Sequence, residues 1–196
     1  MDITIIGTGY VGLVTGSCFA EIGHTVTCFD INQSKISNLK KGKIPFFESG
    51  LEDLVKKNIS SQNLIFSSSI KSAVRNKFIF ICVDTPDDGK GKPNLSNLNN
   101  VVDSLAEQLN QDSIIIFKST VPIGTNKIMQ TRLRDAVKNR FNVDVISNPE
   151  FLREGSAVND FMRPDRIIIG GDSKESCNKL ANLYKPLSRK MDKMFF

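Results

Sequence analysis

The sequence predicts an α/β fold in which helices cover both faces of a doubly wound, mostly parallel sheet. Three observations support this prediction: short apolar segments alternate with helical patterns along the chain, a glycine-rich turn joins the first strand to the first helix, and segment 78–83 is apolar throughout. Such alternation is typical of βαβ units, and a continuously apolar strand is typical of a sheet that is covered on both faces.

The predicted strands are short segments rich in β-branched and aromatic residues. The first reads I-T-I-I, and the most apolar one reads F-I-F-I-C-V. Turn residues or helical patterns bound each of them, which favours strands over longer buried helices. In chain order the predicted strands are 3–6, 25–29, 63–66, 78–83, 113–117, 143–146 and 166–169, and residues 191–196 begin a further one.

Helices are predicted where apolar residues recur at helical spacing. In one such segment Leu51, Leu54 and Val55 fall on one face, and the first predicted helix is small, apolar and stops at Gly23. Residues 147–165 show no clear period and are rich in polar groups. The predicted helices are 11–22, 34–41, 51–59, 69–75, 95–109, 125–140 and 173–184.

The composition is that of an ordinary globular protein with a mild excess of positive charge. The 196 residues carry a net charge of +5 and are 40% hydrophobic, so a core can form without a disulfide or a metal. The densest basic group is Lys185, Arg189, Lys190 and Lys193, which we interpret as a solvated helix end, and no nucleic-acid partner is expected. No apolar run approaches the roughly 20 residues that cross a bilayer, so no membrane partner is expected.

The cysteines argue against a metal or disulfide centre. None of Cys18, Cys28, Cys82 and Cys177 forms a C-x-x-C pair, and Cys28 and Cys82 lie in apolar runs, where a small buried side chain is expected. This usage is typical of a reducing compartment, and the chain opens directly on a strand pattern, so no signal peptide is expected. We therefore expect a cytoplasmic protein with no metal site.

The glycine-rich turn G-T-G-Y-V-G predicts a site for the phosphates of a dinucleotide. Gly7 permits a tight turn, Gly9 lets the backbone approach a pyrophosphate, and Gly12 lets the helix pack closely on the strand. The amino end of the helix, at Tyr10 and Val11, offers N–H groups and a partial positive charge to the phosphates. The pattern is typical of the Rossmann fold, and the alternative is a glycine-rich turn that binds no dinucleotide.

An acid at the end of the second predicted strand favours NAD as the dinucleotide. Asp30 follows Gly12 by 18 residues. A carboxylate at this place accepts hydrogen bonds from both ribose hydroxyls and repels a 2′-phosphate, so NAD is favoured over NADP. Lys35, just beyond Asp30, adds positive charge near the ribose or the pyrophosphate, and the alternative is a solvated lysine.

Six segments in series resemble those of a known family. They read G-T-G-Y-V-G-L-V, F-D-I-N-Q-S-K-I, I-C-V-D-T-P, K-S-T-V-P-I-G-T, N-P-E-F-L-R-E-G-S-A and F-M-R-P-D-R-I-I-I-G. In this order and spacing, from Ile3 to about Tyr184, they resemble the UDP-glucose/GDP-mannose dehydrogenase family. The last segment is more similar to the UDP-glucose branch of that family than to the GDP-mannose branch.

The resemblance implies an NAD-dependent oxidoreductase of nucleotide-sugar metabolism and polysaccharide biosynthesis. The implied reaction oxidises the C6 alcohol of UDP-glucose to the carboxylate of UDP-glucuronate with two NAD molecules, through a thioester on a catalytic cysteine. The alternatives are a dehydrogenase of GDP-mannose or of a UDP-N-acetylhexosamine, or a chain that binds NAD without catalysis. The implied partner is therefore UDP-glucose or a related nucleotide sugar.

The sequence departs from the family in what it lacks. The family's catalytic cysteine lies in a G-x-G-G-x-C motif that is missing here, and its conserved lysine and asparagine lie beyond Phe196. We therefore expect residues 1–196 to form the NAD-binding Rossmann-like domain, without the family's central and C-terminal substrate-binding domains. We expect this chain to be inactive alone, and the resemblance implies that the full-length protein is a homodimer.

The resemblance also implies roles for three hydroxyl residues that follow predicted strands. Thr85, Ser119 and Thr120 contact NAD, and Thr120 helps to position the catalytic water. The carboxyl ends of parallel strands are where ligands bind in open sheets. The alternatives are a strand-terminating turn at Thr85 and helix-capping hydroxyls at Ser119 and Thr120.

The segment N-P-E-F-L-R-E carries two carboxylates, Glu150 and Glu154, four residues apart. In a helix this spacing would place both on one face, where a carboxylate could accept the C6 proton or deprotonate water. The resemblance implies that Glu150 and Glu154 line the substrate and nicotinamide end, that Glu154 also touches NAD, and that Phe151, Leu152 and Arg153 frame the nucleotide sugar. The alternative is a loop with two solvated acids.

Overall fold

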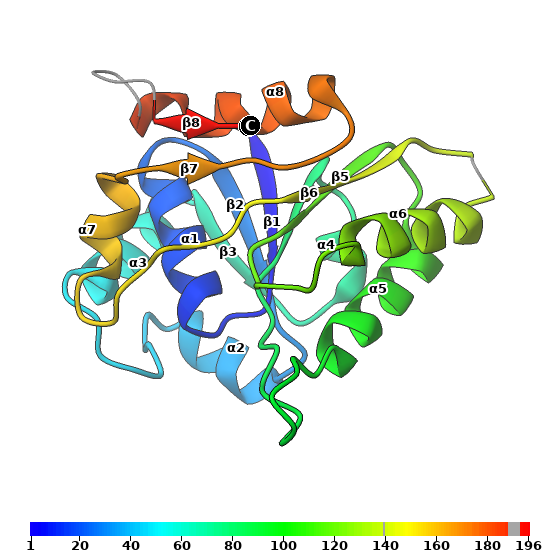
Figure 1. The fold of residues 1–196 in the computed structure, drawn as a ribbon. Helices are drawn as coiled ribbons and strands as arrows, with labels where there is room; N and C mark the ends of the chain where they lie inside the picture. Colours follow the sequence, from blue (N-terminus) through cyan, green and yellow to red (C-terminus); the bar gives the residue numbers. More distant parts are fainter. Residues whose placement is uncertain (139, 188–192) are drawn as a thin grey trace.

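The computed structural model describes residues 1–138, 140–187 and 193–196. Its centre is a six-stranded parallel sheet in the order β3-β2-β1-β4-β5-β6, which confirms the predicted doubly wound, Rossmann-type sheet (Figure 1). The strands are β1 (Asp2–Ile6), β2 (Thr25–Phe29), β3 (Leu64–Ser67), β4 (Phe78–Ile81), β5 (Ser113–Phe117) and β6 (Val143–Ser147). The chain therefore starts in the middle of the sheet, winds to one edge, and then returns to wind to the other.

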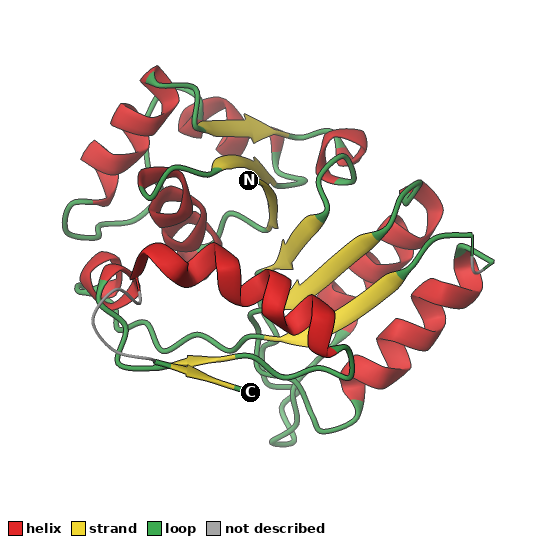
Figure 2. Cartoon of the chain, turned by 90° about the horizontal axis from the view of Figure 1, so that it is seen from above, coloured by secondary structure: helices red, strands yellow, loops and turns green. Residues whose placement is uncertain are grey.

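Helices cover both faces of this sheet (Figure 2). They are α1 (Tyr10–Glu21), α2 (Gln33–Leu39), α3 (Leu51–Ser60), α4 (Ile70–Ala73), α5 (Ser96–Gln108), α6 (Thr125–Ala136), α7 (Ala157–Met162) and α8 (Lys174–Tyr184). One core lies between the sheet and α1, α2, α3, α7 and α8, and the other lies between the sheet and α4, α5 and α6. The prediction of helices on both faces is therefore confirmed.

Alternate residues of each central strand point into the two different cores. Ile3 and Ile5 of β1 join the core under α1, whereas Ile6 joins the core under α5 and α6. In β4, Phe80 and Ile79 divide in the same way. Because side chains alternate across a strand and both faces are buried, the central strands must be apolar at nearly every position.

Helix α1 lies very close to the strands beneath it. A β-carbon on Gly12 would fall 1.9 Å from the carbonyl oxygen of Gly7, and one on Gly16 would fall 2.6 Å from the sulfur of Cys28. Gly7 itself has a φ of +95°, a conformation that favours glycine. These glycines bring the amino end of α1 against the carboxyl end of β1.

Two expectations about the last third of the chain were wrong. The segment 147–165, in which no period was recognised, contains α7, whose Phe161 ring lies 5.1 Å from that of Phe19 in α1. The strand predicted for 166–169 is reduced to β7 (Ile167–Ile168), which pairs in parallel with β8 (Met194–Phe195) outside the six-stranded sheet. Both differences arise from contacts between distant parts of the chain, which local patterns do not reveal.

Of the other predicted features, one helix is shorter than expected, and some residues lie outside the described part of the chain. The helix predicted for 125–140 ends at Ala136, with Val137 as its C-cap. Arg189 and Lys190 of the basic group, and residues 191–192 of the last predicted strand, lie outside the described residues. Within the described parts of the chain, no helix has both the length and the apolar character needed to cross a bilayer.

Replacing Gly12 by alanine tests the close approach of α1. Because the new β-carbon would meet the backbone oxygen of Gly7 at 1.9 Å, the free energy of unfolding is expected to fall by about 3 kcal/mol or more. Urea denaturation followed by circular dichroism measures the change. Gly9→Ala is the matched control, because the nearest atom to its new β-carbon is 3.9 Å away. Equal stability of the two variants would contradict this packing.

Candidate functional site

Two cavities open where the strands of the sheet end. The first, of about 540 Å³, is bordered by residues that follow β1, β2 and β4, and the second, of about 270 Å³, by residues that follow β5 and β6. The predicted cofactor residues that line the first cavity are Gly7, Gly9, Asp30 and Lys35. The predicted substrate residues that line the second are Glu150, Phe151, Leu152 and Arg153. The predicted residues that border neither cavity are Tyr10, Val11, Gly12, Thr85, Ser119, Thr120 and Glu154.

The amino end of α1 is open to a ligand. Gly9 is the N-cap and has no side chain to bond the first N–H groups of the helix, which belong to Tyr10 and Val11. The first turn of α1 contains no acidic residue. A β-carbon on Gly9 would lie 3.9 Å from the nearest atom, an oxygen of Asp84, so the surface there is free for close approach. Unpaired N–H groups at a helix start attract anions, and this end of α1 is therefore suited to phosphate.

The carboxylate of Asp30 lies beside this helix end, at the tip of β2. One of its oxygens accepts hydrogen bonds from the backbone N–H of Thr8 at 3.0 Å and from the Thr8 hydroxyl at 2.7 Å. The same oxygen accepts from the ammonium group of Lys35 at 3.1 Å, and the other oxygen accepts from the N–H of Asn32 at 3.0 Å. Burial pushes the pKa of Asp30 up, but these hydrogen bonds outweigh it and hold the pKa below its ordinary value. Asp30 is therefore an anion that also anchors the glycine-rich turn.

The loops that follow β4 and β5 are joined by hydroxyl groups. The Ser119 hydroxyl donates to the carbonyl oxygen of Val83 at 2.5 Å, and the Thr85 hydroxyl donates to the carbonyl oxygen of Thr120 at 3.4 Å. Because the Ser119 hydroxyl already donates its one proton to the Val83 carbonyl oxygen, it can only accept a hydrogen bond from a ligand. The structure thus brings together the three residues that the sequence analysis selected from two separate strand ends.

The two predicted carboxylates do not share a helix face. Residues 148–153 have no regular structure and Glu154 lies in a turn, so the helix that would align Glu150 with Glu154 through i,i+4 spacing does not form. Glu150 borders the second cavity and its carboxylate accepts from the backbone N–H of Leu152. Glu154 is exposed. Glu150 therefore lies at the cavity and Glu154 lies at the surface, although the two acids are only four residues apart in the sequence.

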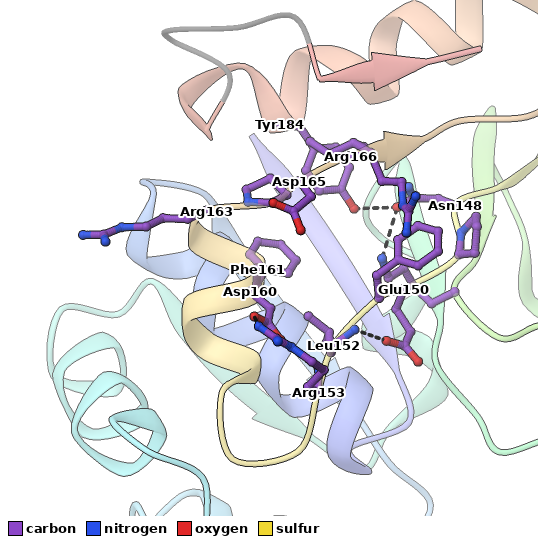
Figure 3. Close-up of a pocket in the computed structure, with 15 residues that line it drawn as sticks. Asn148, Glu150, Leu152, Arg153, Asp160, Phe161, Arg163, Asp165, Arg166 and Tyr184 are labelled. Carbon is purple, nitrogen blue, oxygen red and sulfur yellow. Dashed lines mark hydrogen bonds and ion pairs between the residues drawn. The ribbon is translucent and has the colours of Figure 1, made fainter.

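A salt bridge fixes the outer wall of the second cavity (Figure 3). The Arg153 guanidinium donates to both carboxylate oxygens of Asp160, at 2.7 and 3.1 Å, and the backbone N–H of Arg153 donates to Asp160 at 3.0 Å. The Arg166 guanidinium lies 4.8 Å from the centre of the Phe151 ring, a cation–π arrangement. The side chain of Arg163 points away from the cavity. Arg153 and Asp160 of this wall are therefore already paired with each other.

Lys118 is a residue of the second cavity that the sequence analysis missed. Its side chain follows β5, is 5% exposed, and lies 3.5 Å from the amide oxygen of Asn148, which also accepts from the Tyr184 hydroxyl. None of the ion pairs among the described residues includes Lys118. Burial lowers the pKa of Lys118 to about 8. The available signal was a lysine directly after a continuously apolar strand.

Glu48 is a second residue that the sequence analysis missed. It is 2% exposed and lies in the loop between α2 and α3, far from other site residues in the sequence. Its carboxylate accepts hydrogen bonds from Tyr10 and from the backbone of residues 155 and 157. No local pattern marks this acid, because its partners are about 40 and 110 residues away.

Replacing Lys118 by methionine is expected to change how stability depends on pH. The folded-state pKa of about 8 lies below the ordinary value of 10.5, so the unfolded chain binds more protons between these values, and wild-type stability rises with pH through that window. At pH 7 the variant is expected to be more stable by about 1–3 kcal/mol, because it buries no charge. Urea denaturation at several pH values between 7 and 10 should show this advantage shrinking.

The control for this experiment is Lys127→Met, which removes the same charge from an exposed place on α6. Its difference from the wild type should stay nearly constant over the same pH range. A Lys118→Met difference that does not shrink between pH 7 and 10 would contradict a buried ammonium group at this place.

Comparison with known proteins gives consistent matches over nearly the whole chain. A sequence model described as the NAD binding domain of the UDP-glucose/GDP-mannose dehydrogenase family matches residues 1–188. The chain is 48% identical over 185 residues to the UDP-glucose 6-dehydrogenase TuaD of Bacillus subtilis, covering 94% of this chain and 40% of that protein. It is 45% identical over 191 residues to the UDP-glucose 6-dehydrogenase of Rhizobium meliloti, covering 95% and 44%. The chain thus spans less than half the length of these relatives.

Solved structures agree with these matches. A UDP-glucose dehydrogenase from Pyrobaculum islandicum superposes with a TM-score of 0.90 at 34% identity, covering 95% of this chain and 44% of that chain. A GDP-mannose dehydrogenase from Pseudomonas aeruginosa superposes with a TM-score of 0.90 at 29% identity, covering 99% and 45%. The resemblance carried by the six sequence segments is confirmed. The chain belongs to the UDP-glucose/GDP-mannose dehydrogenase family, and residues 1–188 correspond to the family's NAD binding domain.

Proposed function

We propose that this chain is the NAD-binding part of a UDP-glucose 6-dehydrogenase, which oxidises UDP-glucose to UDP-glucuronate in the cytoplasm and serves polysaccharide biosynthesis. The observation that carries the proposal is the open amino end of α1, whose N-cap Gly9 borders, together with Asp30, a cavity of about 540 Å³. The two curated relatives above are named for UDP-glucose, which favours this substrate over GDP-mannose or a UDP-N-acetylhexosamine. By the same likeness, we propose a homodimer for the whole protein.

The residues of the first cavity fit the adenosine diphosphate half of NAD. The N–H groups of Tyr10 and Val11 would hold the pyrophosphate, and Gly9 leaves room for it because even a β-carbon there would lie 3.9 Å from its nearest neighbour. The Asp30 carboxylate would accept from the ribose hydroxyls and exclude a 2′-phosphate, with Lys35 beside it. When bound, NAD supplies the acceptor for the hydride that leaves C6 of the sugar.

The second cavity and its rim are proposed to hold the nucleotide sugar. Glu150 is half-buried at this cavity, where its carboxylate can take the proton of the C6 hydroxyl as a general base. Phe151, Leu152 and Arg153 would frame the sugar nucleotide, with Arg153 already oriented by its salt bridge. Exposed Thr120 would hold a catalytic water, and Glu154 would stand at the nicotinamide end.

The thioester step needs a reactive thiolate, and the cysteines of this chain do not supply one. All four are buried, and burial raises the pKa of each of them. A thiol that holds its proton at neutral pH is a poor nucleophile. We therefore propose that residues 1–196 bind NAD without completing the oxidation.

Replacing Asp30 by alanine is expected to weaken NAD binding by ~1–3 kcal/mol, because a half-buried acceptor for the ribose hydroxyls is lost. The preference for NAD over NADP should also narrow, since the charge that repels a 2′-phosphate is gone. Isothermal titration calorimetry with both dinucleotides measures these changes. Asp53→Ala, at an exposed acid on α3, serves as the control. Unchanged NAD affinity in Asp30→Ala would reject Asp30 as the ribose anchor.

Purified residues 1–196 are expected not to complete the four-electron oxidation of UDP-glucose, which forms two NADH, because all four thiols are buried and protonated and cannot carry the thioester step. The assay follows NADH absorbance, with calorimetry on the same sample to establish that NAD binds. Formation of two NADH for each UDP-glucose consumed would contradict this expectation.

A further inference from the structure

A buried carboxylate joins three separate segments of the chain. One Glu48 oxygen accepts from the Tyr10 hydroxyl at 2.6 Å and from the backbone N–H of Gly155 at 2.8 Å. The other accepts from the backbone N–H of Ala157 at 3.0 Å. Because Glu48 is 2% exposed, each of these bonds lies in surroundings where an unpaired charge would be costly. The three partners therefore have little freedom to move away from Glu48.

The first partner belongs to the predicted NAD site. Tyr10 is the first residue of α1, and its backbone N–H is one of the two groups proposed to meet the pyrophosphate. Its ring packs 5.2 Å from that of Phe46, and its hydroxyl lies 3.1 Å from the carbonyl oxygen of Arg153. Burial and the neighbouring Glu48 carboxylate raise the pKa of Tyr10, so the hydroxyl keeps its proton as a donor.

The other two partners bracket Glu154. Gly155 and Ala157 are held by Glu48, and Arg153 on the other side is held by Asp160 and lies against Tyr10. Glu154 lies between these fixed residues and forms no side-chain hydrogen bond or ion pair with the rest of the described chain, and its charge is near enough to raise the pKa of Tyr10. The direction of the Glu154 side chain consequently depends on the backbone that Glu48 holds.

We propose that Glu48 is a positioning residue that holds Tyr10 and Glu154, two predicted NAD contacts, in one fixed arrangement and so sets the affinity for NAD. The inference rests on the proposed NAD binding, and Glu48 itself touches no ligand. The physical basis is preorganisation: a site whose backbone is already fixed loses less conformational freedom when the dinucleotide binds.

The test uses Glu48→Gln, Tyr10→Phe and the double variant of the 196-residue chain, with NAD affinity measured by calorimetry below the melting temperature of each. Glutamine keeps the size of the side chain but turns an NH₂ group toward donors. We expect Glu48→Gln to bind NAD about tenfold more weakly. Tyr10→Phe, which removes one of the three bonds, should show a smaller loss, and the double variant should match Glu48→Gln because both changes break the same link.

Glu52→Gln is the matched control, because it makes the same substitution at an exposed glutamate four residues away that pairs with Lys56 at the surface. Its NAD affinity should equal that of the wild type. Hydrogen exchange gives a second readout: the amides of Gly155 and Ala157 should exchange faster in Glu48→Gln but not in Glu52→Gln, while those of the central strands stay protected.

Wild-type NAD affinity in Glu48→Gln, additive losses in the double variant, or unchanged exchange at Gly155 and Ala157 would each overturn the proposal. If Glu48→Gln does not fold, Tyr10→Phe decides, and wild-type affinity in that variant overturns it. Failure of the wild-type chain to bind NAD is a different result, since it would reject the proposed function itself.

Discussion

The close contact between α1 and the strands beneath it is the constraint on which the site depends. Gly12 and Gly16 lack the side chains that would keep the helix away, since a β-carbon would fall 1.9 Å from the Gly7 oxygen at the first position and 2.6 Å from the Cys28 sulfur at the second. The same contact places Gly9, the N-cap of α1, at the border of the cavity beside Asp30. The backbone arrangement that lets α1 pack closely on the strands is therefore the same one that leaves its first N–H groups available to an anion.

Three charged side chains, which are buried or half-buried, fix the turns and loops around the amino end of α1 and supply charge to the two cavities. Asp30 fixes the glycine-rich turn through Thr8, Glu48 joins the start of α1 to the segment before α7, and Lys118 brings a positive charge to the second cavity. Two of these charges are satisfied by hydrogen bonds within the chain. Lys118 is the exception among them, because its hydrogen bond to the Asn148 amide oxygen is long, at 3.5 Å, and burial lowers its pKa. Such a group costs stability and is found more often at sites of function than elsewhere.

Local patterns predicted the elements that one segment can specify by itself. The strands from β1 to β6 and the glycine-rich turn were found because continuous apolar runs and glycine spacing are local signals. Helix α7 was missed because its six residues lie in a polar segment and gain their order from packing Phe161 against α1. The pairing of β7 with β8 was missed because each strand has only two residues, too few for a period.

In the candidate site, too, the residues that were predicted are those that a local pattern marks. Gly7, Gly9, Asp30 and Lys35 were predicted from spacing alone, and the structure places them around one cavity. Glu48 and Lys118 were missed because their partners come from other parts of the chain, and a lone acid or lysine has no local signature. Glu150 and Glu154 do not share a helix face, because their segment has no regular structure before the turn that contains Glu154.

The most direct measurement of the central claim is a crystal structure of residues 1–196 grown with NAD. The account predicts electron density for the adenosine diphosphate moiety across the amino end of α1, with the pyrophosphate against the N–H groups of Tyr10 and Val11 and the ribose hydroxyls on Asp30. An amino end of α1 that stays empty at saturating NAD, or a dinucleotide that binds elsewhere on the chain, would contradict it.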